Sequence, residues 1–177
     1  MSVHPLPQVA GLLLPPDALA VVDAFRRFDR FRGDDESRRL YAVSRRMRGL
    51  MPGDAADAVI AEALLVDAEI RLRSKGRFVF FNEGAPTASA DEAALLNLIG
   101  AMQSADYTAA AEAAIQLEIL QARALFSLAF RLGRRLLEGG VRFRPRSFRG
   151  TAVTARVPEP RPPRGAPSLK LVEGCGG

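Results

Sequence analysis

The chain repeats one order of structural elements. In residues 17–81, an apolar helical run passes through an Asp-containing turn, continues as helix, and reaches a Gly before the aromatic strip Phe78–Phe81. In residues 89–144, helix again passes through an Asp turn and then a Gly pair into the strip Val141–Phe143. The order predicts a mainly α fold, a compact bundle of five to six helices in two pseudo-repeated units, with two short β strips free to pair. Residue identity between the halves is low, so a true duplication stays open.

Start and stop signals place the domain boundaries. Four prolines among the first 16 residues predict an extended N-terminal arm at 1–16, and Asp17 follows as the expected N-cap of the first helix. Ser89 and Glu92 have the spacing of a capping box. Acids are expected to cap two further helices, at Asp54 and Asp106. The signals predict one helical domain over residues 17–146.

Two helical runs contain more apolar residues than one narrow face needs. The run from Asp54 to Lys75 has a wide apolar stripe and is expected to be the central helix. The run over 108–138 contains no proline and is either one long helix or two helices with a bend near Gln121. We expect it to be a core helix or to form a homodimer interface. Leu120 is expected in the core, where a charge would unfold the domain.

Composition limits the class of protein. A hydrophobic fraction of 48% supports a real core. Arg outnumbers Lys by 23 to 2, a bias typical of GC-rich bacterial coding, which weakens any inference that Arg was selected to bind phosphate. Cys175 is the single cysteine, which excludes an intramolecular disulfide and suits a reducing compartment. No uncharged apolar stretch approaches the roughly 20 residues that span a bilayer. These features predict a cytoplasmic protein without a membrane partner.

Positive charge is concentrated at the C-terminus. Residues 141–177 contain eight basic and two acidic groups, a net charge of +6, which leaves −1 for the remainder. Residues 147–177 are rich in Pro, Arg and Gly and are predicted to be a disordered basic tail. Such a tail can bind nucleic acid, an anionic membrane or an acidic protein, or can serve only as a solvated segment.

Residues typical of catalysis are sparse. His4 is the single histidine and lies in the Pro-rich arm, so a Ser-His-Asp triad or a His-rich metal site is not expected in the folded part. Neither Gly-x-Gly-x-x-Gly nor the Walker pattern occurs. The sequence predicts no catalytic residue, cofactor or metal, and indicates a protein that is not an enzyme. An enzyme that uses carboxylates alone, or a cofactor held in the helical core, is the lowest-ranked alternative.

The basic residues are the strongest candidates for binding. Between Arg26 and Arg48 there are nine Arg against four acids, which would form one basic face if the first two helices make a hairpin. A second group follows the last predicted strip. The candidate partner-binding residues are Arg26, Arg27, Arg30, Arg38, Arg39, Arg45, Arg46, Arg142 and Arg144. A solvated arginine face without a partner is the competing interpretation.

Two functional hypotheses follow. The first is a small, non-catalytic interaction or regulatory protein, adaptor-like or chaperone-like, that binds a partner protein through an apolar groove or the arginine face. The alternative is nucleic-acid binding by the Arg26–Arg48 face and the basic tail, with an affinity that falls steeply with salt. Arg alone contacts phosphates and reads little sequence, and the second predicted helix offers few other polar groups for base edges.

Overall fold

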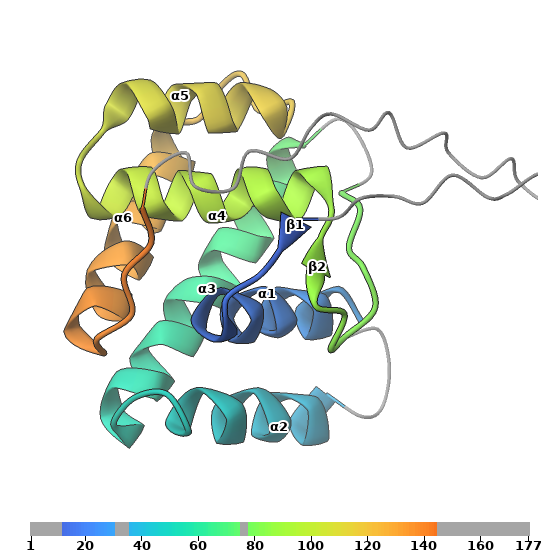
Figure 1. Cartoon of the computed structure of the whole chain (residues 1–177). Helices are drawn as coiled ribbons and strands as arrows, with labels where there is room; N and C mark the ends of the chain where they lie inside the picture. Colours follow the sequence, from blue (N-terminus) through green and yellow to red (C-terminus); the bar gives the residue numbers. More distant parts are fainter. Residues whose placement is uncertain (1–11, 31–35, 75–77, 145–177) are drawn as a thin grey trace, which may run out of the picture.

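The computed structural model describes residues 12–30, 36–74 and 78–144, with backbone only for 36–39. Within these ranges the fold is mainly α, as predicted (Figure 1). The helices are α1 (Pro16–Asp29), α2 (Glu36–Arg48), α3 (Gly53–Arg73), α4 (Ala90–Gln103), α5 (Tyr107–Gln116) and α6 (Arg123–Glu138). The predicted tail at 147–177 and most of the predicted arm at 1–16 lie outside the described residues.

Helices of the same half of the sequence pack together, but the most extensive helix–helix contact, between α3 and α6, joins the two halves. Helices α1, α2 and α3 pack against one another, and α4 packs against α5 and α6. Contacts of α3 with α6 and of α1 with α4 join the halves, and Figure 1 shows α4 lying between α5 and α1. The contacts therefore do not separate the molecule into two units, and the pseudo-repeat of the sequence stays a prediction.

Two expected N-caps are wrong. Pro15 is the N-cap of α1 and Pro16 is its first helical residue, so Asp17 lies inside the first turn. Likewise, α3 begins after Pro52, and Asp54 makes no side-chain cap. Proline suits the first helical turn because its missing N–H is not needed there. Both acids still favour the positive end of the helix dipole.

Two other caps are confirmed. The Ser89 Oγ accepts a hydrogen bond from the Glu92 backbone N–H at 3.1 Å, and Glu92 Oε2 accepts from the Ser89 N–H at 2.8 Å, which completes the capping box. At α5, Asp106 Oδ1 accepts from the Ala109 N–H at 2.9 Å. These short-range pairs fix where α4 and α5 begin.

The run over 108–138 is two helices, which confirms the second of the two alternatives. α5 ends at Gln116, and Glu118 adopts a left-handed conformation with φ of 58°. Leu117 and Ile119 are buried, whereas Leu120 is 79% exposed. The expectation that Leu120 is a core residue is therefore wrong. In the segment that connects α5 to α6, residues 117–120 alternate between buried and exposed. The helical periodicity that predicted a core position for Leu120 therefore does not apply there.

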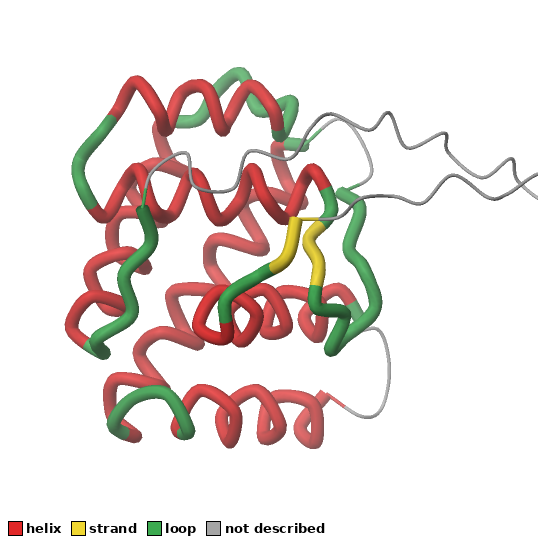
Figure 2. The backbone as a smooth tube through the Cα atoms, in the orientation of Figure 1, coloured by secondary structure: helices red, strands yellow, loops and turns green. Residues whose placement is uncertain are grey.

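The two predicted β strips are not strands. The two-stranded antiparallel sheet joins β1 (Leu12–Leu13) to β2 (Thr87–Ala88), with Leu12 opposite Ala88. Residues 78–81 and 141–144 have no regular secondary structure. Figure 2 shows them as loop segments near opposite ends of α4, too far apart to pair with each other.

Side chains of α4 and its capping box supply the hydrogen bonds that a neighbouring strand would otherwise give to the first strip. The Val79 N–H donates to Asp91 Oδ2 at 2.7 Å, and the Phe81 N–H donates to Glu92 Oε1 at 3.0 Å. The Ser89 hydroxyl donates to the Val79 carbonyl at 2.5 Å. Because buried backbone groups need partners, these bonds fix an extended segment without a ladder.

One residue at the other end of α4 has the same role. The Gln103 Nε2 donates to the Val141 carbonyl at 3.0 Å, and Gln103 Oε1 accepts from the Phe143 N–H at 2.7 Å. Two glycines allow α4 to lie close to the 141–144 segment and to α6. A Cβ on Gly100 would lie 3.1 Å from Phe143 Cβ, and one on Gly133 of α6 would lie 3.0 Å from Gln103 Cγ. α4 is consequently buried along almost its whole length, and it is the central helix in place of α3.

Candidate interaction surfaces

Arg26, a predicted partner-binding residue, is the centre of a buried polar network. Its side chain is fully enclosed, and it binds Glu92 in a bidentate manner, with Nε to Oε1 at 2.7 Å and Nη2 to Oε2 at 2.9 Å. Nη1 donates to Asp23 Oδ1 at 3.1 Å and to the Ala85 carbonyl at 2.8 Å. Nη2 also donates to the Thr87 carbonyl at 2.7 Å. All five N–H groups of the guanidinium are therefore used.

This network is structural. Burial on its own lowers the pKa of Arg26, but hydrogen bonds and charge from Glu92 and Asp23 outweigh it and raise the pKa above its ordinary value. The guanidinium fastens α1 to the start of α4 and to the segment that contains β2. Arg26 is 1% exposed and is not part of a solvent-facing basic surface, which corrects its assignment as a partner-binding residue.

Most other arginines of the predicted face whose side chains the structure describes are met by groups of the same chain. Arg46 Nη2 lies 3.1 Å from Asp23 Oδ2 as a charge contact, although its geometry is not that of a hydrogen bond. The remaining partners are Glu83 for Arg27, Asn82 for Arg30 and Asp57 for Arg48. The side chains of Arg38 and Arg39 lie outside the described residues. Whether these arginines bind a partner stays a prediction.

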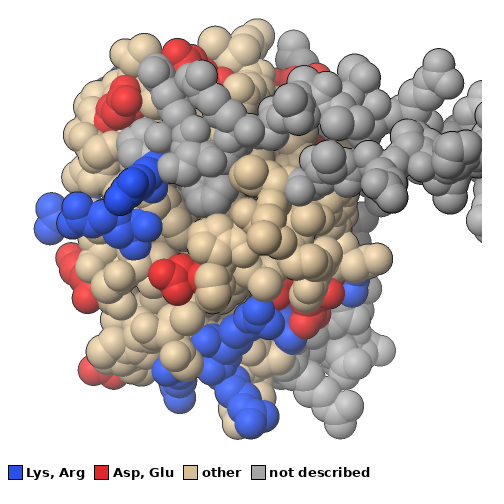
Figure 3. Space-filling view, in the orientation of Figure 1, with Lys and Arg blue, Asp and Glu red and all other residues tan. Residues whose placement is uncertain are grey.

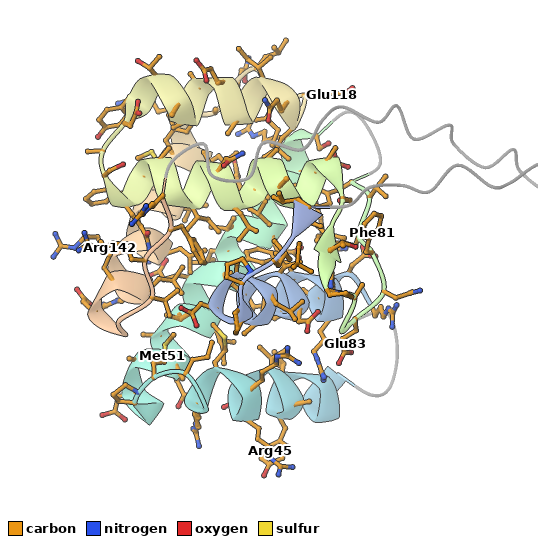
Figure 4. The ribbon with its side chains drawn as sticks, viewed as in Figure 1. Arg45, Met51, Phe81, Glu83, Glu118 and Arg142 are labelled. Atoms are coloured by element: carbon orange, nitrogen blue, oxygen red, sulfur yellow. The ribbon has the colours of Figure 1, made fainter. Side chains whose placement is uncertain are left out.

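Three predicted arginines, Arg45, Arg142 and Arg144, are exposed and have no such partner among the residues that the structure describes. Arg45 lies on the outer side of α2 and points away from the protein, and Arg142 lies on a different side of the molecule (Figure 4). Arg144 is also exposed. On the face shown in Figure 3, the described basic side chains form separate groups with acidic side chains nearby. On that face, the arginines of the Arg26–Arg48 region and those that follow the last predicted strip therefore do not form one continuous basic surface.

α3 has an apolar face on its outer side, which the sequence-based reasoning missed. Its inner face packs into the core, with Val59, Ala63, Val66 and Ile70 buried. The opposite face is exposed, with Leu65 at 45% and Leu72 at 72%. We call this exposed set the α3 stripe: Ala61, Leu65, Ala68 and Leu72. Its spacing of four, three and four residues was the available signal.

Ion pairs lie along both sides of the α3 stripe. Toward α6, Glu62 Oε1 accepts from Arg131 Nη2 at 2.7 Å. Toward α1, Arg71 pairs with Asp67 at 2.7 Å and lies 3.5 Å from Asp29. Burial raises the pKa of Asp67 above its ordinary value, although the bond and charge of Arg71 oppose the rise. The stripe is therefore an apolar strip with polar edges.

An open groove lies beside the C-terminal end of α3, where the chain enters α6. Its volume is about 710 Å³. Leu120 lies on it, with Arg73 and Arg123 among the charged groups. Arg73 pairs with Glu69, whereas Arg123 has no polar partner among the described residues. We call this site the α6 groove, lined by Arg73, Leu120, Gln121, Ala122, Arg123, Ala124 and Ser127.

Within the described ranges, no group of three or more His, Cys, Asp and Glu residues is arranged to hold a metal ion. No helix among the described residues is long and apolar enough to cross a bilayer. Comparisons of the chain with protein-family models, curated proteins and solved structures gave no match.

Proposed function

We propose that this protein is a protein-interaction module whose α6 groove binds a segment of a partner protein. The segment presents an apolar side chain to Leu120 and a carboxylate to Arg123. The observation that supports the proposal is the coincidence of a large, 79% exposed leucine with an open groove of about 710 Å³. Sites of protein association commonly combine an apolar centre with a polar rim.

The charges of the groove favour an acidic partner. Two of the lining residues are arginines and none is acidic. Arg123 is exposed without a polar partner among the described residues, so its guanidinium is available for a carboxylate. Arg is also among the residues enriched at energetically important interface positions. An acidic, amphipathic helix would match both the apolar and the basic parts of the groove.

The α6 groove is favoured over the arginine face as the binding surface. Arg26 is buried, and Arg27, Arg46 and Arg48 already contact acids of the same chain. A phosphate backbone would have to compete with those intramolecular contacts. Nucleic-acid binding by the basic tail stays the alternative, and a fluorescence anisotropy titration with single-stranded DNA at low salt tests it.

Selection from a displayed peptide library tests the α6 groove. Selection on the full chain is expected to enrich sequences in which leucine or phenylalanine is flanked by glutamate or aspartate. Binding of the enriched peptides should fall at least tenfold with Leu120→Glu or Arg123→Glu, because each change places a negative charge against an acidic ligand. Fluorescence anisotropy with the labelled peptides measures the loss.

Arg45→Glu is the matched control, because it makes the same charge change on another helix and should leave peptide binding intact. Enrichment of basic peptides, or equal binding to the Leu120→Glu variant, would overturn the proposal. Far-UV circular dichroism of each variant separates lost binding from lost fold. Leu120→Glu should remain folded because the side chain is already exposed.

A further inference from the structure

We infer that the α3 stripe binds a second copy of this chain, with the two α3 helices antiparallel. The inference concerns a different surface from the α6 groove and does not depend on the groove's function. An apolar stripe on a helix is normally packed against another element. α3 lies against α1, α2 and α6, yet its outer face is left to solvent.

The residues of the α3 stripe match one another in size when two copies run antiparallel. If the two-fold axis passes between residues 66 and 67, Leu72 lies opposite Ala61 of the partner subunit, and Leu65 lies opposite Ala68 of the partner subunit. Each large side chain then meets a small one in all four layers, as close packing requires. A parallel pair in register would instead place leucine against leucine and leave gaps between the alanines.

The charges at the two ends of α3 favour the same arrangement. Acidic Asp54 and Asp57 lie in the first turns, and Arg71 and Arg73 lie in the last turn. In the antiparallel register given above, Arg73 of the partner subunit lies level with Ile60, three residues along the helix from Asp57, and the helix dipoles also oppose favourably. A two-fold interface must be complementary to itself, and this face is complementary in size and in charge.

The length and edges of the α3 stripe suit a helix–helix contact. From Ala61 to Leu72 the stripe extends over about 16 Å at 1.5 Å per residue. The pairs Glu62–Arg131 and Asp67–Arg71 border it on its two sides, so the apolar centre has a polar rim. The 108–138 segment, from which the sequence predicted a homodimer, is less suited. The inner face of α6 is buried within the chain, and its outer side is rich in arginine.

Size-swap variants test both the surface and the orientation. Sedimentation equilibrium of the full chain should give a concentration-dependent mass that approaches twice 19.1 kDa. Ala68→Leu should weaken the dimer by about tenfold or more, because leucine then meets leucine. The double variant Leu65→Ala, Ala68→Leu restores a large residue opposite a small one and should recover most of that loss.

Two further variants separate this interface from other surfaces. Leu65→Glu should give a monomer with an unchanged circular dichroism spectrum, since it places like-charged groups near the axis. Tyr107→Glu, at a 60% exposed position on α5, should leave the dimer intact, as should Leu120→Glu in the α6 groove. A wild-type chain that stays monomeric, or an Ala68→Leu variant that associates more strongly, would overturn the inference.

Discussion

α3 and α4 both lack a continuous polar face, but their surroundings differ. α4 is buried from Glu92 to Met102, because α1, α5, α6 and two extended segments cover it. α3 has neighbours on its inner face and flanks only, and the α3 stripe stays exposed. The difference shows that an apolar sequence pattern indicates that a helix face will be covered. It does not indicate whether the same chain or another molecule covers that face. We propose that a second copy of the chain covers the α3 stripe.

The covering of α4 depends on long-range polar contacts at both of its ends. Arg26, 66 residues away in sequence, binds Glu92 at the start of α4, and Gln103 holds the 141–143 segment at the end. Figure 2 shows the extended segments 78–81 and 141–143 near the two ends of α4. The outer side of α3 has only ion pairs along its edges. Removing individual contacts should therefore affect the two helices very differently.

The largest expected effect comes from a charge on each helix. Leu96→Asp on α4 places a carboxylate at a fully buried position and should destabilise the fold by more than about 4 kcal/mol. Leu65→Asp on α3 should leave the folding of the monomer within about 0.5 kcal/mol, because that side chain already reaches solvent. Urea unfolding followed by circular dichroism, at concentrations where the Leu65→Asp variant is monomeric, measures both. Equal losses would remove the distinction between the helices.

Breaking the buried network should have the next largest effect. Arg26→Ala leaves Glu92 as a buried carboxylate without its cation, leaves Asp23 with only the charge contact of Arg46, and should cost about 3–5 kcal/mol of folding free energy. Arg45→Ala removes an exposed arginine and should change stability by less than about 0.5 kcal/mol. Thermal and urea unfolding of the two variants provide the comparison. A loss below about 1 kcal/mol for Arg26→Ala would contradict the structural role of the network.

A smaller loss is expected at the other end of α4. Gln103→Ala removes the hydrogen bonds to the Val141 carbonyl and the Phe143 N–H, at a cost of about 1–3 kcal/mol. Hydrogen exchange at the Phe143 amide should accelerate more than exchange in the middle of α4. Gln121→Ala in the α6 groove is the control, and it should change neither quantity measurably. Unchanged protection at Phe143 would show that Gln103 does not hold this segment.

The smallest effect concerns pH and the flank of α3. Burial raises the pKa of Asp67 in the fold, so its protonated form is favoured there relative to the unfolded chain. Compared with Asp67→Asn, the wild type should gain stability as pH falls from 7 through the raised pKa. The gain should stop below the ordinary value of 3.8. Urea unfolding of both proteins over pH 3–7 tests the direction, and a relative loss of wild-type stability on acidification would contradict it.

Features that depend on neighbouring residues were predictable from the sequence. The capping box at Ser89 and Glu92 and the cap at Asp106 formed as expected, because each bond joins residues three apart. The helical class also followed from local patterns, and the break within residues 108–138 was one of two alternatives that those patterns left open. Asp17 and Asp54 failed as caps because a preceding proline already starts each helix.

Features that depend on distant partners were not predictable. Nothing near Arg26 in sequence marks it as buried, since its main partner is 66 residues away. The two strips looked like strands, yet their hydrogen bonds go to side chains at the ends of α4. The α3 stripe lay within a pattern that correctly indicated a widely apolar helix. The sequence could not show which side would remain exposed.

The α3 stripe is tested most directly by the mass of the protein in solution. Sedimentation equilibrium of the wild-type chain and of Leu65→Glu, at matched concentrations, compares the same fold with and without an apolar stripe. We expect the wild type to approach twice 19.1 kDa and Leu65→Glu to remain at 19.1 kDa with an unchanged melting temperature at low concentration. A wild type that stays at 19.1 kDa at every concentration would contradict the assignment of the α3 stripe as an interface between copies.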